Sequence, residues 1–201
     1  MSTQDPATVG TAAAILASGG VILYPTDTLY GLGADALSDK AVTKVYAIKG
    51  REAGKPVSCI VADLTMAEAY VEIPEPARAL ARRFLPGPLT MILKKKKSIN
   101  TGIARDIDTI AIRIPDHSFC LTLARAYGKP ITTTSANRSG EKSELSTDKI
   151  LAQLGSVAST IDLVIDGGAL PESSPSTIVD MSSGEMIIMR QGALRIPSAK
   201  S

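Results

Sequence analysis

The stretch Thr109-Ile110-Ala111-Ile112-Arg113-Ile114 alternates between isoleucine and residues that are small or polar. Side chains of a β-strand point alternately to its two faces, so the three isoleucines share one face and Thr109, Ala111 and Arg113 share the other. The first face suits a hydrophobic core, and the second carries a hydroxyl and a guanidinium. The segment predicts a strand that borders a polar site, although an edge strand with a solvated arginine has the same pattern.

Outward from this strand, apolar segments alternate with helical ones without a linker or a repeat. Several connections are too short for a parallel crossover, so we expect strands of mixed direction in one α/β domain, residues 1–201, with a core at about 10–196 and frayed ends. Further strands are expected at 21–24, 56–61, 89–93, 131–134, 163–165, 177–180 and 186–189. Helices are expected at 8–18, from a Ser38 cap to Gly50, and at 77–84, 119–127 and 146–154.

The composition excludes several classes of protein. Lys and Arg number 22 against 20 Asp and Glu, a net charge of +2, which gives no strong general attraction for nucleic acid. Aromatic residues make up 3% of the chain, too few to favour a protein that stacks bases on exposed rings. Two cysteines and one histidine cannot form a zinc site alone. Neither a signal peptide nor an apolar run of membrane-spanning length is present, so we expect a soluble, cytoplasmic protein without membrane contact.

The common catalytic motifs are absent from the sequence. A single histidine leaves little scope for a Ser-His-Asp or Cys-His arrangement, and neither G-x-S-x-G nor the phosphate-binding motifs G-x-x-x-x-G-K-[ST] and G-x-G-x-x-G occurs. Gly31-Leu32-Gly33 is interpreted as a tight turn after the strand at 21–24. Conventional hydrolases, dehydrogenases and P-loop proteins are therefore excluded.

Hydroxyl and amide groups gather where the strand at 131–134 ends. Thr133, Ser135 and Asn137 share one face if the chain stays extended, and the polar loop continues through Ser139 to Ser143. A few convergent polar groups at a strand end are typical of sites for phosphate or carboxylate. A threonine-rich strand followed by an asparagine turn is the structural alternative.

Cations accompany this donor-rich loop. Lys49, Arg51 and Lys55 follow a helix, and Arg190 ends an apolar strand. Arginine binds phosphate through two parallel hydrogen bonds and lysine acts as a point charge, so these residues suit a polyphosphate, although they could also complement the helix dipole. The run Lys94 to Lys97 is interpreted as a solvated hairpin tip, with an RNA phosphate contact as the alternative. The pattern favours an enzyme that positions an anionic nucleotide and stabilises charge.

Four motifs in order carry a resemblance to a known family: the residues Tyr24-Pro25-Thr26-Asp27-Thr28-Leu29-Tyr30-Gly31-Leu32-Gly33, then Lys49-Gly50-Arg51, Phe84-Leu85-Pro86-Gly87-Pro88-Leu89-Thr90 and Ser135-Ala136-Asn137. From about Gly19 to Ile196 the chain resembles the short, single-domain YrdC-like threonylcarbamoyl-AMP synthases. The resemblance implies a twisted mixed sheet flanked by helices around a concave, positively charged cavity. It also implies that L-threonine, bicarbonate and ATP give threonylcarbamoyl-adenylate and pyrophosphate, for threonylcarbamoyl-adenosine next to the anticodon of tRNA.

The resemblance also implies roles for particular residues. Its Lys-x-Arg and Ser-x-Asn signatures fall on Lys49, Arg51, Ser135 and Asn137, taken as catalytic. Threonine would contact Thr28, Arg113, Thr133 and Ser176, and ATP would contact Arg51, Lys55, Thr109, Ser135, Ser143 and Arg190. Mg²⁺ would accompany ATP without a protein carboxylate cluster, and a separate tRNA-modifying transferase complex would use the product.

Two other functions remain open on the sequence. The first is a diverged paralogue that binds double-stranded RNA by its shape and phosphates, or contacts tRNA, without synthase activity. The second is a domain that handles carbamoyl phosphate, as in hydrogenase maturation factors, although the zinc-finger and acylphosphatase-like regions of those proteins are absent from this sequence.

Overall fold

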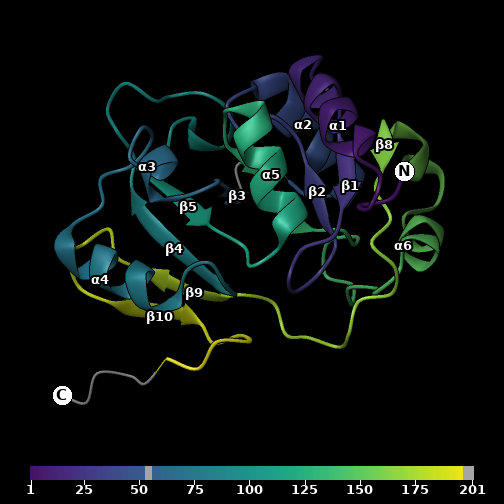
Figure 1. Cartoon of the computed structure of the whole chain (residues 1–201). Coiled ribbons are helices and arrows are strands. Elements are labelled where there is room, and N and C mark those ends of the chain that lie inside the picture. The colour runs from purple at the N-terminus through teal and green to yellow at the C-terminus, as the bar shows by residue number, and fades with distance from the viewer. Residues whose placement is uncertain (53–55, 197–201) are drawn as a thin grey trace.

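The computed structural model describes residues 1–52 and 56–196, whose strands form two mixed sheets (Figure 1). The first has the order β7-β2-β1-β8, and only β1 and β8 are parallel. The second has the order β10-β9-β4-β5-β3-β6, in which β9 is parallel to β4 and β3 to β5. The strands are β1 (Ile22–Tyr24), β2 (Gly31–Gly33), β3 (Ser58–Ile60), β4 (Leu89–Lys94), β5 (Thr109–Arg113), β6 (Ile131–Thr132), β7 (Thr134–Ser135), β8 (Leu163–Val164), β9 (Thr177–Asp180) and β10 (Ile187–Arg190).

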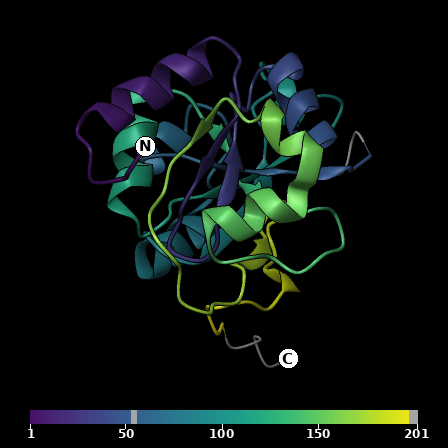
Figure 2. The ribbon, with the colours of Figure 1, turned by 90° about the vertical axis from the view of Figure 1, so that its right-hand side faces the viewer.

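The helices surround these sheets, as Figures 1 and 2 show from two sides. Helices α1 and α5 pack together over one side of β1, and α2 and α6 contribute to the core on its other side. Helices α3 and α4 cover one face of the six-stranded sheet. Their bounds are α1 (Ala7–Ala17), α2 (Asp39–Lys49), α3 (Leu64–Ala67), α4 (Glu75–Phe84), α5 (Ser118–Tyr127) and α6 (Thr147–Leu154), with 3₁₀ turns at Gly102–Ala104 and Gly155–Thr160.

The predicted mixed α/β class is confirmed, with the strands divided between two sheets. Ser38 caps α2 as expected, since its side chain accepts a hydrogen bond from the Ala41 amide. Helix α3 and both 3₁₀ turns were not predicted, because they are too short to show an apolar period. No helix within the described ranges has the length and apolar character needed to cross a membrane.

Alternation along β4 and β5 gives the six-stranded sheet two different faces. Leu89, Met91 and Leu93 of β4 lie in the core under α4, together with Ile110 and Ile112 of β5. The residues between them point to the opposite face, where Thr90, Ile92, Ala111 and Arg113 border a cavity. The predicted division of the 109–114 strand is confirmed, and the open face of the sheet is available for a site.

The prediction of a turn at 31–33 was wrong, because Gly31–Gly33 is strand β2, paired antiparallel to β1. Its glycines provide space rather than a positive φ angle. A Cβ atom at Gly33 would lie 2.7 Å from Cε1 of Tyr24 and 2.9 Å from Cγ1 of Ile22. The Tyr24 ring is fully buried and its hydroxyl donates to the Thr132 carbonyl at 3.0 Å, so it cannot move aside without losing that bond.

Gly33→Ala is therefore expected to lower the free energy of unfolding by about 1–3 kcal/mol, the usual range for overpacking a core. Urea unfolding of the two proteins measures the difference. Gly10→Ala is the matched control, because nothing lies within 4 Å of a Cβ atom at Gly10 in helix α1. That change should leave stability equal or slightly higher, since alanine favours a helix. Equal effects at both positions would contradict the steric explanation.

The lysine run ends β4 and begins the long connection between β4 and β5, which pair as a hairpin. Lys95 has a structural role, because its ammonium donates to the Asn100 side chain and to the Ala104 carbonyl, both at 2.8 Å. One of the four lysines therefore holds its own loop in place.

Candidate functional site

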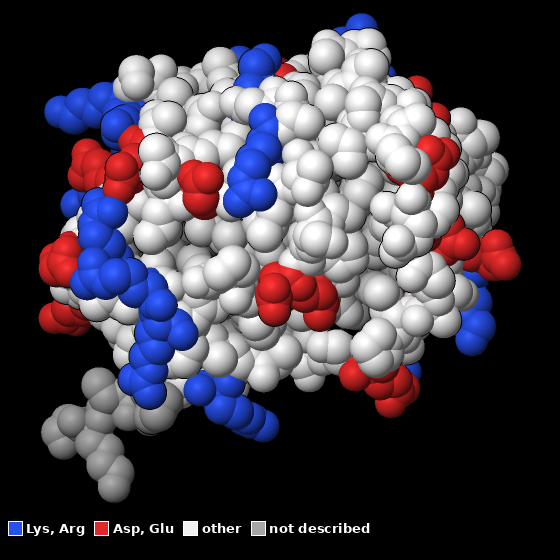
Figure 3. All heavy atoms as spheres, viewed as in Figure 1, with Lys and Arg blue, Asp and Glu red and all other residues white. Residues whose placement is uncertain are grey.

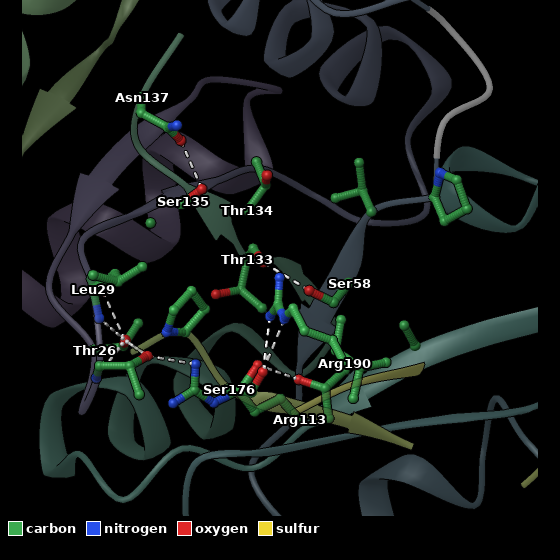
Figure 4. Close-up of a pocket in the computed structure, with 18 of the residues that line it drawn as sticks. Thr26, Leu29, Ser58, Arg113, Thr133, Thr134, Ser135, Asn137, Ser176 and Arg190 are labelled. Atoms are coloured by element: carbon green, nitrogen blue, oxygen red, sulfur yellow. Dashed lines mark hydrogen bonds between the residues drawn. The ribbon is translucent and has the colours of Figure 1, made fainter. Parts of the chain in front are cut away.

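A cavity of about 350 Å³ lies where the two sheets meet (Figure 4). The chain passes from one sheet to the other at Thr133, the single residue between β6 and β7. The Thr133 amide donates to the Ser58 carbonyl at 2.7 Å, and the Ser58 hydroxyl donates to the Thr133 carbonyl at 2.8 Å. This reciprocal pair fixes the junction, and both residues line the cavity.

Arg113 reaches the cavity from the end of β5. Its Nη1 donates to the Thr28 hydroxyl at 2.8 Å, and its Nη2 forms an ion pair with Asp27 at 2.5 Å. The side chains of Arg113 and Asp27 are 6% and 11% exposed, so the pair is largely shielded from solvent. Asp27 does not line the cavity, whereas Arg113 and Thr28 do. Asp27 therefore orients the guanidinium from behind the cavity wall.

The loop that presents Thr28 is held by a neighbouring hydroxyl. Thr26 Oγ1 accepts from the amides of Thr28 and Leu29, at 3.1 and 3.2 Å, and donates to the Leu29 carbonyl at 2.7 Å. Such a turn, closed by a threonine hydroxyl, replaces backbone hydrogen bonds that the loop cannot otherwise make. The result is a fixed position for Thr28 beside Arg113.

Lys49 enters from the last turn of α2 and binds the 135–137 loop. Its ammonium donates to the Ser135 carbonyl at 2.5 Å and to the Asn137 carbonyl and Oδ1, both at 3.0 Å. Three N–H groups thus have three acceptors on the protein. Burial, together with the nearby charge of Arg51, lowers the pKa of Lys49 to about 8.

The Ser-x-Asn segment completes this network. The Ser135 hydroxyl donates to Asn137 Oδ1 at 2.6 Å, and Asn137 Nδ2 donates to the Glu141 carbonyl at 2.6 Å. The Ser139 amide returns to the Lys49 carbonyl at 2.9 Å. The Lys-x-Arg and Ser-x-Asn segments, 86 residues apart in sequence, therefore form one hydrogen-bonded unit.

Arg190, at the end of β10, closes another part of the wall. Its Nε and Nη2 both donate to the Ser176 carbonyl, at 3.2 and 2.8 Å, as the dashed lines in Figure 4 show. Burial, followed by the charge of Arg113, lowers the pKa of Arg190 from its ordinary value. The Ser176 hydroxyl in turn forms a 2.8 Å hydrogen bond with Thr90 of β4.

The charged side chains of the cavity wall are all positive among the described residues. Four cationic side chains line it, and among the lining residues that the structure describes there is no Asp, Glu, His or Cys. The cations are Lys49, Arg51, Arg113 and Arg190. Nine threonine and serine residues accompany them among the described residues, so this wall offers positive charge and hydroxyl groups but no carboxylate. A small ligand with several negative charges fits this chemistry.

The structure brings together nine of the twelve residues that the sequence singled out. These line the cavity: Thr28, Lys49, Arg51, Arg113, Thr133, Ser135, Asn137, Ser176 and Arg190. Thr109 shares a strand face with Arg113 but lies at the far end of β5, opposite Lys94, and is not part of the wall. Ser143 lines a neighbouring cavity that shares Leu29 and Pro175 with this one. Lys55 lies outside the described residues.

Sequence reasoning gave no role to several residues of the site. Asp27 and Thr90 stand inside motifs that were quoted without a role for either residue, and Ser58 lies in a strand that was taken only as apolar. Alternation was the available signal for Thr90, because its neighbours Leu89 and Met91 are both apolar. No sequence pattern places Asp27 next to Arg113, since 86 residues separate them.

In the part of the chain that the structure describes, no cluster of three or more His, Cys, Asp or Glu residues could hold a metal ion. The donors at the cavity are cations, hydroxyls and amides. They fit a metal ion only as the companion of a bound anionic ligand.

The two sheets and their cationic cavity thus define an α/β protein with a cavity whose chemistry suits a small, negatively charged ligand. Comparison with known proteins makes this more specific. Residues 14–192 match the Sua5/YciO/YrdC family, whose description is telomere recombination, and the chain belongs to this family.

Its relatives are named as enzymes. The chain is 43% identical over 179 residues to a putative threonylcarbamoyl-AMP synthase of Methanocaldococcus jannaschii, covering 89% of this chain and 83% of that one. It is 36% identical to the threonylcarbamoyl-AMP synthase of Bacillus subtilis, covering 96% of this chain and 56% of that one. The solved structure of Pyrococcus abyssi Sua5 with L-threonine superposes with a TM-score of 0.84 at 36% identity, over 92% of this chain and 54% of that one. The chain therefore spans about half the length of two of these relatives.

Proposed function

We propose that this protein is an L-threonylcarbamoyl-adenylate synthase, a nucleotidyltransferase that makes threonylcarbamoyl-AMP and pyrophosphate from L-threonine, bicarbonate and ATP. The observation that carries the proposal is the cavity wall, which has four cations and, among the described residues, no carboxylate. All three substrates carry an anionic group, and parts of all three are joined in the product, so their negative charges must be brought close together. The names of the relatives support the same activity.

Threonine occupies the part of the cavity beside Arg113. Its carboxylate pairs with the guanidinium, which Asp27 and Thr28 already orient. The hydroxyls of Thr28, Thr133 and Ser176 also contact the amino acid and orient it. That P. abyssi Sua5 was solved with L-threonine supports a threonine site in this fold.

ATP lies toward the other cations. Arg51 and Arg190 neutralise phosphate charge, and Ser135 contacts the nucleotide from the same part of the wall. Lys49 acts here mainly through the loop, because all three of its N–H groups already have acceptors on Ser135 and Asn137. Mg²⁺ comes with the triphosphate, held by phosphate and water rather than by a protein carboxylate cluster.

The chemistry has two steps. The neutral threonine amine attacks the carbon of bicarbonate and a C–N bond forms. The C–OH bond breaks, and the hydroxide takes one amine proton and leaves as water, which gives a carbamate. A carbamate oxygen then attacks the α-phosphorus of ATP, and the bond to pyrophosphate breaks. The protein supplies position and fixed positive charge for both steps, and such preorganised charge is commonly the largest catalytic contribution.

The test is incubation of the purified protein with ATP, Mg²⁺, L-threonine and labelled bicarbonate, followed by chromatography for labelled threonylcarbamoyl-adenylate. Pyrophosphate release is expected to require both threonine and bicarbonate, so reactions that omit either one are the controls. Pyrophosphate release without threonine, or a folded protein that makes no product, would overturn the proposal.

Downstream, we propose that a separate transferase complex moves the threonylcarbamoyl group to adenosine in tRNA, in the cytoplasm. The RNA-binding alternative has less support. On the face shown in Figure 3, blue and red side chains lie close together rather than forming a purely basic surface. On α4, Arg78 pairs with Glu68 and Arg82 with Glu75, both at 2.5 Å. Retained RNA binding without any product in the test above would favour that alternative.

A further inference from the structure

We propose that Thr90 is a positioning residue of this site, which makes the Ser176 hydroxyl a hydrogen-bond donor to the carboxylate of the amino-acid substrate. The inference rests on the proposed function for the identity of that substrate. It is drawn from the hydrogen bond between the two hydroxyls, from their burial, and from the position of Thr90 across from Arg113.

The two hydroxyls form an isolated pair. Thr90 Oγ1 and Ser176 Oγ are 2.8 Å apart, and within residues 1–52 and 56–196 neither atom makes another hydrogen bond. Thr90 is 2% exposed and Ser176 is 7% exposed, and both line the cavity. Two hydroxyls have two protons, and their mutual bond uses only one. One proton therefore has no acceptor in the described protein.

Which of the two hydroxyls donates the hydrogen bond follows from where the remaining proton can find an acceptor. If a ligand donated to Ser176, Ser176 would donate to Thr90, and the Thr90 proton would stay buried without an acceptor. If Thr90 donates to Ser176, the Ser176 proton is free to bond a ligand, and both protons are used. An unsatisfied buried donor is costly, so the second arrangement is favoured. Ser176 is also the more exposed of the two residues, so a ligand reaches its hydroxyl first, and the ligand atom there is an acceptor.

The neighbouring strand indicates which acceptor this is. Thr90 lies directly opposite Arg113 in the antiparallel pairing of β4 and β5, so their side chains share the cavity face of the sheet. Arg113 carries the positive charge that attracts a carboxylate, and Ser176 is fixed on the other side of Thr90. A carboxylate has two oxygens, one for the guanidinium and one for the Ser176 hydroxyl.

The carbonyl of Ser176 strengthens this assignment. It accepts both hydrogen bonds from Arg190, so the backbone of Ser176 is held while its hydroxyl is held by Thr90. The Ser176 side chain is thus fixed at two points. A hydroxyl that is already oriented loses little freedom when the ligand binds.

The test compares Thr90→Val with Thr90→Ser. Valine keeps the shape but removes the hydroxyl, and calorimetry should show threonine binding about 3- to 10-fold weaker, the usual value of one net hydrogen bond. Serine keeps the hydroxyl and should restore binding nearly to that of the wild type. The affinity for ATP should not change in either variant, and thermal melting checks that both remain folded.

Two further measurements separate this role from simple packing. In a Ser176→Ala background, Thr90→Val should have no further effect on threonine binding. If Thr90→Val acted only through packing, it would weaken threonine binding by the same factor in both backgrounds. L-2-Aminobutyrate lacks the side-chain hydroxyl of threonine but keeps the carboxylate. Its affinity should therefore fall in Thr90→Val by the same factor as the affinity for threonine.

The outcomes are distinct. Additive effects, or an equal loss of ATP affinity, would overturn the positioning role. An unchanged affinity for L-2-aminobutyrate would show that Ser176 bonds the side-chain hydroxyl of threonine instead, and would overturn the carboxylate assignment. If the wild type binds no threonine at all, the proposed function fails and this inference fails with it. Threonine binding that is equal in wild type and Thr90→Val overturns the inference alone.

Discussion

Arg113→Ala is expected to weaken threonine binding by about 2–5 kcal/mol, the cost of truncating one partner of a buried charged hydrogen bond. ATP binding should change much less, because the guanidinium is directed to Asp27 and Thr28 rather than to the other three cations. Isothermal titration with each ligand separately measures the two effects. Equal losses for threonine and ATP would count against the assignment.

The same substitution is expected to destabilise the fold by about 3–5 kcal/mol, because the Asp27 carboxylate would be left buried without its partner. The double variant Arg113→Ala/Asp27→Asn removes that carboxylate charge. It should recover much of the stability while threonine binding stays weak. Chemical unfolding of both variants separates the structural part of the effect from the binding part. Recovery of threonine binding in the double variant would refute a direct role for Arg113.

Lys49→Met should lower synthase activity by about 10²-fold, the effect of misplacing the residues of a site by about 1 Å. Methionine has a similar length but no N–H groups, so the carbonyls of Ser135 and Asn137 lose their donor. The loop that carries both side chains would no longer be fixed. Lys40→Met on the exposed side of the same helix is the matched control, and its steady-state rate should equal that of the wild type. Equal rates for both variants would contradict the role of the network.

The lowered pKa of Lys49 predicts how this network depends on pH. Because its pKa is about 8 rather than 10.5, the neutral amine accumulates as the pH rises above about 8. An amine has two N–H groups where the ammonium has three, so one acceptor in the loop loses its partner. Activity should therefore fall on the alkaline side, and Lys49→Arg should remove this fall, since a guanidinium stays charged. An alkaline limb that Lys49→Arg does not move would refute the assignment to Lys49.

The parts of the fold that depend on local pattern could be predicted from the sequence. The alternation at 109–114 identified which side chains face the core, and Ser38 marked the start of α2. The division into two sheets could not be predicted, because it depends on long-range strand pairing, and at Thr133 the chain changes partners within a continuous extended segment. The glycines of β2 were assigned to a turn because their actual constraint, the Tyr24 ring, lies on another strand.

The site shows the same limit. Motifs and strand ends pointed to the cations and hydroxyls, and nine of the twelve residues that were singled out meet at one cavity. How they are connected could not be predicted. The charges of Lys49 and Arg51 suggested direct contacts to an anion, yet Lys49 is bound to the protein itself. Pairings such as Asp27 with Arg113 are long-range contacts, which a sequence without its fold does not reveal.

The position of the cavity at the junction of the two sheets affects how easily the two sheets can separate. Arg113 and Ser176 belong to the six-stranded sheet and its connections, whereas Ser135 belongs to the four-stranded sheet. A ligand that contacts both groups acts as a non-covalent cross-link between the two sheets, close to the crossing at Thr133. Fluctuations that separate the sheets would have to release the ligand first. Ligand binding is thereby linked to the stability of the fold.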